Sequence, residues 1–367
     1  MRRSRWLAAW KDSERKPAIY HCVTRVVERR FAFGIEEKER FRTLMRMMEI
    51  FTGCRVLSYC LMCNHIHILL EVPPMPADGI GDEDFLKRLS VLYSEGFVAD
   101  VAGQLEAAKA EGGLEGGNVE RVKEIKERFT YRMHDLGQFM KGLLQRFTQW
   151  FNGRHKRTGT LWEQRFKSVI VESGTAARTM AAYIDLNPVR AGMVKDPADY
   201  RWSSYGEAVG GGVKGNGKKA RIGLILAVQN PEDRDLIPVD AWKEVSRRYR
   251  RLLGIAMDRK PGNAEVEVSR KMRIRKNDAE VLESGDDETS LPELTMVKML
   301  RCRVRYFTDG GVIGSKEFVN GAFADARERF SERRKDGARR MRGNAKAASG
   351  MLWSMRDLRL EIEGAQR

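Results

Sequence analysis

The 367-residue sequence has few cysteines and no long hydrophobic run. Its five cysteines form an odd, sparse set, which indicates reduced thiols in a cytoplasm and argues against a disulfide framework. No stretch approaches the roughly 18–20 uninterrupted apolar residues that a membrane-spanning helix needs. The first residues, Met1 to Lys16, also lack the apolar core of a signal peptide. We therefore expect a cytoplasmic protein with no membrane partner.

Acidic residues are in deficit, with 51 Asp and Glu against 67 Lys and Arg, which gives a formal net charge of +16. A basic surplus of this size favours polyanionic partners, chiefly nucleic acid once a membrane is set aside. At 42% hydrophobic residues the chain can still bury a sizeable core, and its length allows two or three domains.

Hydrophobic periodicity predicts an α+β fold in the amino-terminal half of the chain. We expect strands at Ala18–Val27, Cys54–Met62, His65–Val72 and Arg165–Val171, and helices at Glu36–Phe51, His134–Asn152 and Thr175–Asn187. Residues 74–132 form a predicted helical insertion with a glycine-rich, flexible middle. Without it, the first six elements follow the β-α-β-β-α-β order of a ferredoxin-like antiparallel sheet.

The rest of the chain has weaker patterns. We expect a first domain at residues 15–210, a linker with a helical segment at 211–292, and a basic, α-rich C-terminal extension at 293–367. Within the extension, the run from Arg333 to Arg342 suits an accessory grip on duplex or hairpin DNA, or a soluble tail.

Histidine is also scarce, yet two of the five histidines fall within three residues. Alternate side chains of a strand share a face, so His65 and His67 can present two nitrogen ligands to one metal ion. The alternative is a pair of sheet histidines satisfied by hydrogen bonds. Cys60 and Cys63 form a nearby C-x-x-C, but no second pair completes a cysteine-rich zinc site, which favours ordinary buried cysteines.

Tyr183 and Asn187 lie four residues apart on a predicted helix and therefore share a face. Imidazole nitrogens and an amide oxygen suit Mg²⁺ or Mn²⁺ acting on a phosphate, and a tyrosine phenol is a suitable nucleophile for a phosphodiester. The alternatives are a packed helix tyrosine and an asparagine that caps the helix before Pro188.

These residues lie in strings that resemble single-tyrosine HUH transposases. Tyr59 to Val72 (YCLMCNHIHILLEV) resembles the HUH motif, and Ala182 to Val194 resembles the catalytic helix of the REP-associated tyrosine transposase (RAYT) branch. Further agreement occurs at Ile19–Arg25, Gly159–Ser168 and Asp199–Tyr205. The resemblance covers about residues 15–210, interrupted by the insertion, and Cys63 replaces a proline found in many relatives.

The resemblance implies an HUH endonuclease fold and a bacterial, metal-dependent transposase that nicks and joins single-stranded DNA. It implies that His65 and His67 bind Mg²⁺ or Mn²⁺ and that Tyr183 forms a 5′-phosphotyrosine link. Asn187 falls where the family places a third, amide-type ligand. The expected partner is single-stranded DNA that bears a hairpin. A monomer and a homodimer both remain open.

Basic residues interleave with Trp162 and Phe166 around the last predicted strand. Such a mixture suits single-stranded DNA, because cations pair with phosphates and aromatic rings stack on bases, although a solvated basic face is the plainer interpretation. The candidate DNA-binding residues are Arg154, Lys156, Arg157, Arg165, Lys167 and Arg190. Two other functions stay open: a non-catalytic DNA-binding or regulatory protein, and a zinc-stabilised nucleic-acid-binding module.

Overall fold

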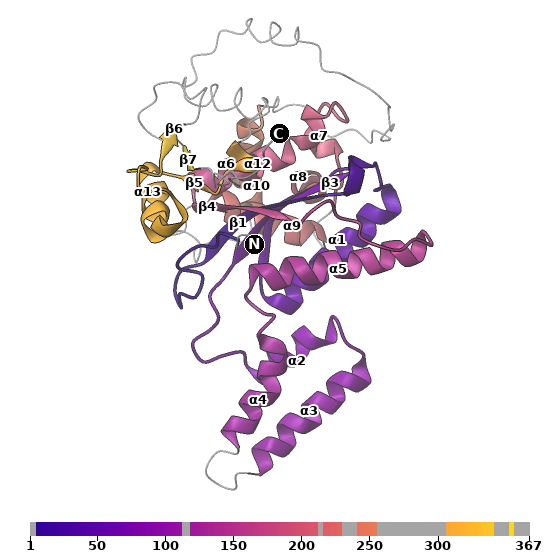
Figure 1. The fold of residues 1–367 in the computed structure, drawn as a ribbon. Helices are drawn as coiled ribbons and strands as arrows, with labels where there is room; N and C mark the ends of the chain where they lie inside the picture. Colours follow the sequence, from indigo (N-terminus) through magenta and orange to yellow (C-terminus); the bar gives the residue numbers. More distant parts are fainter. Residues whose placement is uncertain are drawn as a thin grey trace, which may run out of the picture.

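The computed structural model describes residues 5–111, 118–211, 216–229, 241–254, 306–340 and 352–355 (Figure 1). Its centre is an antiparallel sheet in the order β2-β3-β1-β4. These strands are β1 (Ala18–Arg25), β2 (Arg55–Leu61), β3 (His65–Val72) and β4 (Lys167–Val171). The ends of each strand lie within three residues of the predicted ends. The order of the four strands is that of a ferredoxin-like sheet. The predicted α+β fold is therefore confirmed.

Helices cover both faces of the sheet (Figure 1). Helices α1 (Ile35–Thr52) and α5 (Leu136–Arg154) pack together on one face through contacts such as Phe41 with Phe147, whose ring centroids lie 5.0 Å apart. Helix α1 ends at Gly53, whose φ of 71° is a left-handed conformation that glycine adopts without strain. A short 3₁₀ turn, Val27–Arg29, precedes α1.

Helix α6 (Thr175–Asp185) lies on the opposite face and contacts β2, β3 and β4 (Figure 1). The predicted helix Thr175–Asn187 is thus two residues too long, because Asn187 begins a separate short helix, α7 (Asn187–Arg190). Pro188 explains the break, since proline has no N–H to continue the hydrogen bonds of α6. A 3₁₀ turn at Pro197–Asp199 and helix α8 (Ser204–Gly210) follow.

The predicted insertion contains three helices, α2 (Asp82–Ser90), α3 (Glu95–Ala110) and α4 (Val119–Thr130), which project away from the sheet (Figure 1). They pack through Phe85, Phe97 and Phe129. The glycine-rich middle, residues 112–117, lies outside the described residues.

The described C-terminal residues extend the central sheet. Strand β5 (Val312–Gly314) pairs in parallel with β4, and β7 (Trp353–Met355) and β6 (Arg339–Arg340) follow it, with α12 (Tyr306–Asp309), α13 (Lys316–Asp325) and a 3₁₀ turn at Arg327–Arg329 around them. Helices α9 (Asn216–Val228) and α10 (Ala241–Leu252) precede this part. The predicted domain boundaries and the role of Arg333–Arg342 stay predictions, and much of 211–292 lies outside the described residues.

None of the helices that the structure describes is long and apolar enough to cross a membrane.

Candidate metal and tyrosine centre

The two paired histidines lie on the sheet face that α6 covers. His67 stands opposite Val23 of β1 and Cys60 of β2, and His65 stands opposite Arg25 at the end of β1. Their ring centroids are 5.1 Å apart. His67 is buried, with 2% of its surface exposed, whereas His65 is partly exposed. The alternation predicted from the strand pattern therefore sets both imidazoles side by side.

Helix α6 brings Tyr183 to this pair. The centroid of its ring lies 6.1 Å from that of His67, and the two ring planes are nearly perpendicular at 84°. Tyr183 is 5% exposed. Strand β3 and helix α6 are far apart in the chain, so the packing of the helix on the sheet assembles the group that the sequence suggested.

A third histidine, His21 of β1, was missed by the sequence analysis. Its Nε2 lies 3.0 Å from Nδ1 of His67, and its Nδ1 lies 2.7 Å from the carbonyl oxygen of Phe307. His21 is fully buried, and its ring centroid is 6.1 Å from that of Tyr183. The strand pattern places His21 on the same face as Val23 and Arg25, which the sequence could have shown. Only the pairing of β1 with β3 shows that His21 contacts His67.

Burial keeps these two imidazoles neutral. It lowers the pKa of His21 to about 4, because the buried ring cannot be solvated when charged. Burial also lowers the pKa of His67 well below its usual value, and the nearby His65, His21, Arg190 and Arg25 lower it further. Both rings therefore carry a single proton at neutral pH, as a metal-binding histidine must.

His65 is held through the same ring nitrogen as His67. Its Nδ1 lies 2.7 Å from Oδ1 of Asn64, and the amide nitrogen of Asn64 donates to the carbonyl of Arg29 at 2.9 Å. Because a carbonyl only accepts, this second bond orients the amide so that its oxygen faces His65. Nδ1 of neutral His65 is then the donor, and Nε2 carries the lone pair that can bind a metal ion.

The donor set suits a metal centre that is completed by oxygen ligands. Within the described part of the chain, no group of three or more His, Cys, Asp or Glu residues is arranged to hold a metal ion. If His65 and His67 bind a metal ion, the remaining ligands would be amide, phosphate or water oxygens. Cys60 is buried, and burial raises the pKa of its thiol well above the usual value, as for an ordinary buried cysteine.

Asn187 contacts the end of its neighbouring helix. Its side-chain amide donates to the carbonyls of Tyr183 at 3.3 Å and Ile184 at 3.0 Å. These bonds satisfy terminal carbonyls of α6, as the capping interpretation predicted. They use the amide nitrogen, so Oδ1 is the atom that would serve a metal ion. The ligand role of Asn187 stays a prediction.

Three basic residues lie around this centre. Arg190 donates to the carbonyl of Tyr183 at 2.6 Å, and its guanidinium carbon is 4.2 Å from the centre of the Tyr183 ring. Lys167 of β4 stands opposite Val23, in the same cross-strand row as His67, and is exposed. Arg25, opposite His65, is exposed as well and was not among the predicted residues. Arg25, Lys167 and Arg190 form the basic rim of the centre.

The other predicted DNA-binding residues have no described contact with the centre. Arg154 ends α5, on the other side of the sheet, where its Nε is 2.9 Å from a carboxylate oxygen of Glu36 (Figure 1). Lys156 and Arg157 follow it in the chain, and Arg157 donates to the carbonyl of Thr160. Arg165 is exposed just before β4. Their contact with DNA stays a prediction.

A residue of the C-terminal region covers the tyrosine. Phe307 of α12 is fully buried, and its ring centroid lies 4.4 Å from that of Tyr183, with 27° between the ring planes. Periodicity gave no indication of this contact, because residues around 300 show no pattern that points to α6. The centre is thus assembled from β1, β3, α6 and the C-terminal region.

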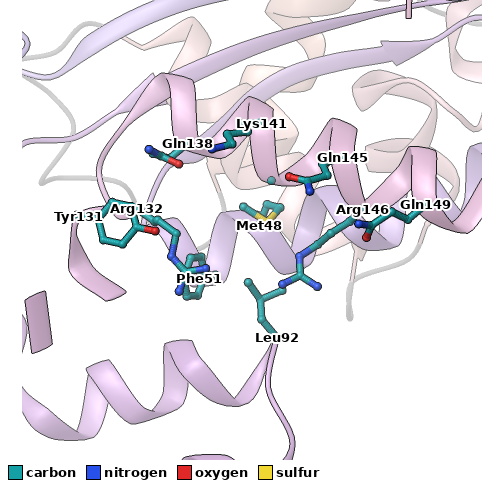
Figure 2. Close-up of a pocket in the computed structure, with 11 residues that line it drawn as sticks. Met48, Phe51, Leu92, Tyr131, Arg132, Gln138, Lys141, Gln145, Arg146 and Gln149 are labelled. Atoms are coloured by element: carbon teal, nitrogen blue, oxygen red, sulfur yellow. The ribbon is translucent and has the colours of Figure 1, made fainter. Parts of the chain in front are cut away.

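A separate cavity lies between α1 and α5, beside the base of the insertion (Figure 2). Its volume is 360 Å³. Met48 and Phe51 line it from α1, and Lys141, Gln145 and Arg146 line it from α5. None of the candidate metal or catalytic residues contributes to its lining.

Comparison with known proteins supports the resemblance deduced from the sequence. Residues 15–77 match the family model described as "Transposase IS200 like". This segment spans β1 to β3 and contains both paired histidines. The family that it matches is a family of enzymes. The resemblance to single-tyrosine transposases is therefore confirmed over these residues. No curated protein sequence matches the chain.

One solved structure is similar, that of a REP-associated tyrosine transposase bound to a REP hairpin. The two chains are 13% identical, the alignment covers 59% of this chain and 88% of that chain, and the TM-score is 0.31.

Proposed function

We propose that this protein is a metal-dependent enzyme that nicks and rejoins single-stranded DNA through a covalent 5′-phosphotyrosine on Tyr183. The observation that carries the proposal is the contact of the Tyr183 ring with His67, within 6.1 Å between centroids, beside a segment that matches IS200-like transposases. A tyrosine, two imidazoles and a basic rim are the groups that such a reaction needs at one place.

The chemistry exchanges one phosphoester bond for another. The Tyr183 phenol loses its proton as its oxygen forms a bond to the phosphorus of the scissile phosphodiester. The bond between phosphorus and the 3′ oxygen breaks, and that oxygen takes up a proton and leaves as a 3′-hydroxyl. A later 3′-hydroxyl reverses these steps and releases Tyr183. Because the number of phosphoester bonds is conserved, the joining step needs no nucleoside triphosphate.

His65 and His67 would hold the metal ion through their Nε2 atoms, with Oδ1 of Asn187 as a third ligand. A bound Mg²⁺ or Mn²⁺ would polarise the phosphate and offset the charge that develops on it. Arg190 places a permanent positive charge against the Tyr183 ring, where it also favours the negatively charged phosphate. Lys167 and Arg25 extend this positive charge along the sheet face, where a DNA backbone would run.

We propose single-stranded DNA that bears a hairpin as the substrate. The net charge of +16 and the basic rim support a nucleic-acid partner. The hairpin follows from the family resemblance, and we propose it on that ground.

The test is trapping of the covalent adduct. Purified protein is incubated with Mn²⁺ and a labelled library of hairpin-bearing single strands with randomised flanks, which removes the dependence on an unknown target sequence. A denaturing gel then separates free DNA from protein-linked DNA. We expect an adduct with the wild type and with Tyr131→Phe, a control for an exposed tyrosine outside the centre, and none with Tyr183→Phe or with a chelator.

An adduct that persists in Tyr183→Phe would disprove the assigned nucleophile. DNA that is bound but never linked by the wild type would instead support the non-catalytic DNA-binding alternative. The ligand roles are tested by Mn²⁺ titration of His65→Ala, His67→Ala and Asn187→Ala against His134→Ala. We expect weaker binding for the first three variants and wild-type affinity for the control.

A further inference from the structure

We propose that His21 is a positioning residue that fixes the proton of His67 on Nδ1, and that the main-chain carbonyl of Phe307 in turn anchors His21. The C-terminal region then completes the metal centre through a chain of two hydrogen bonds. The inference rests on the proposed function only in taking His67 as a metal ligand.

The chain of bonds begins at a group that can only accept. The carbonyl oxygen of Phe307 lies 2.7 Å from Nδ1 of His21, so this nitrogen must carry a proton and donate it. Neutral imidazole has one N–H, and therefore Nε2 of His21 is left as an acceptor.

The second hydrogen bond determines which ring nitrogen of His67 carries the proton. Nε2 of His21 lies 3.0 Å from Nδ1 of His67, so the latter is the donor. The two ring planes differ by 12° and their centroids are 5.2 Å apart, as expected for two rings that meet edge to edge, with the N–H of one directed at the in-plane lone pair of the other. Nε2 of His67 then has no proton and can bind a cation.

Burial makes this arrangement decisive. His21 is 0% exposed and His67 is 2% exposed, so water cannot readily replace either bond. Without His21, the His67 ring could place its proton on either nitrogen and rotate about its side-chain bonds. The tautomer with the proton on Nε2 cannot bind the metal through that atom. Hydrogen-bond partners of this kind typically raise metal affinity by about 10- to 100-fold.

The independent bond from His65 to Asn64 supports the same design. There too Nδ1 is held by an acceptor, whose own orientation is set by a backbone carbonyl, that of Arg29. Both metal-facing histidines are therefore anchored through Nδ1. For His67 the final acceptor comes from the C-terminal region, outside the matched segment 15–77.

Two measurements test the inference on the full-length chain. The first is the ¹⁵N NMR tautomer pattern of the metal-free protein labelled on histidine, in which only five histidines contribute signals. The second is the dissociation constant for Mn²⁺ from electron paramagnetic resonance. Both are applied to the wild type, His21→Phe, His21→Gln and the remote control His134→Gln. Neither needs DNA cleavage.

We expect wild-type His67 to carry its proton on Nδ1. His21→Phe should mix the two tautomers and weaken Mn²⁺ binding by about 10- to 100-fold. His21→Gln should restore most of the affinity, because its amide can donate to Phe307 and accept from His67, and His134→Gln should behave as the wild type.

A proton on Nε2 of wild-type His67 would overturn the inference, and so would unchanged Mn²⁺ affinity in folded His21→Phe. If His21→Phe does not fold, the tautomer of wild-type His67 still decides. If His67→Ala binds Mn²⁺ as tightly as the wild type, the proposed metal centre itself fails, which distinguishes that failure from the failure of the role given to His21.

Discussion

The ring of Tyr183 stacks on the ring of Phe307, with 4.4 Å between their centroids. Tyr183 belongs to helix α6, whereas Phe307 belongs to α12 in the C-terminal region. The candidate nucleophile therefore lies beneath a residue that a domain ending near residue 210 would not contain. The C-terminal region contributes both this aromatic cover and the carbonyl that holds His21.

Replacing Phe307 with alanine should both destabilise the protein and uncover Tyr183. Loss of a fully buried phenylalanine costs about 3–5 kcal/mol in the free energy of unfolding. Urea denaturation measures this cost, and nitration by tetranitromethane followed by peptide mapping measures access to Tyr183. Phe307→Leu should keep most of the stability and the protection. Equal nitration of Tyr183 in the wild type and in Phe307→Ala would contradict the covering role.

Replacing Arg190 with glutamine should slow formation of the covalent adduct by roughly 100-fold, because a positive charge at the reacting phosphate is lost. Single-turnover kinetics with a cleavable oligonucleotide measure the rate. Arg190→Lys should retain part of it, since the charge remains but the planar group that lies over the Tyr183 ring is lost. Arg178→Gln, on α6, serves as the control and should react at the wild-type rate.

Lys167→Gln should lower the salt dependence of binding to single-stranded DNA. Each phosphate contact that is removed reduces the slope of log affinity against log salt by about one. Fluorescence anisotropy at several salt concentrations measures the slope. Arg154→Gln is the matched comparison, because Arg154 is paired with Glu36 and lies across the sheet. A larger change for Arg154→Gln than for Lys167→Gln would place the DNA path on the face of α1 and α5 instead.

The metal-free protein should lose stability in acid through His21. Its pKa falls from 6.5 in the unfolded chain to about 4 in the folded protein, so the unfolded state binds more protons between these values. The stabilising contribution is complete above pH 6.5 and is lost as the pH falls towards 4. Urea denaturation at several pH values measures it, and His21→Phe should show a flatter profile across this window.

Asp185 also changes the stability with pH, so the profile of the wild type must be compared with that of His21→Phe. Burial raises the pKa of this carboxyl from 3.8 to about 7, so its contribution is present at low pH and is lost as the pH rises through about 7. The two groups act in opposite directions, and the total profile of the wild type therefore does not isolate His21. The difference between the wild type and His21→Phe does. No difference below pH 6.5 would contradict the assigned pKa.

A buried ionic cluster holds α8 against the sheet and α1. One carboxylate oxygen of Glu207 lies 2.8 Å from both the Arg46 guanidinium and the Tyr59 hydroxyl. Glu207→Gln removes the charge that balances a buried cation, so we expect a loss of about 3–5 kcal/mol in the free energy of unfolding. The control is Glu244, which forms an exposed ion pair with Arg248. Glu244→Gln should change the free energy of unfolding by less than about 1 kcal/mol. Chemical denaturation of both variants measures the difference.

Local periodicity determined much of this protein from the sequence alone. Alternating side chains placed His65 and His67 on one strand face, and helical spacing predicted that Asn187 lies near Tyr183, although Asn187 begins the separate helix α7. The element order predicted the four antiparallel strands β2-β3-β1-β4, which the structure confirms, but not the parallel strand β5 that makes the sheet mixed. Each of these inferences depends only on neighbours within a few residues, where the period of a strand or a helix decides which way a side chain points.

Tertiary structure alone decided which distant residues meet at this centre. The contact between His21 and His67 requires the register that sets Val23 opposite His67, and a shift of one residue would turn His21 to the other face. The cover by Phe307 requires the parallel pairing of β5 with β4, which no local pattern encodes. Such contacts depend on how separate hydrophobic faces pack together, and that packing is a property of the whole chain.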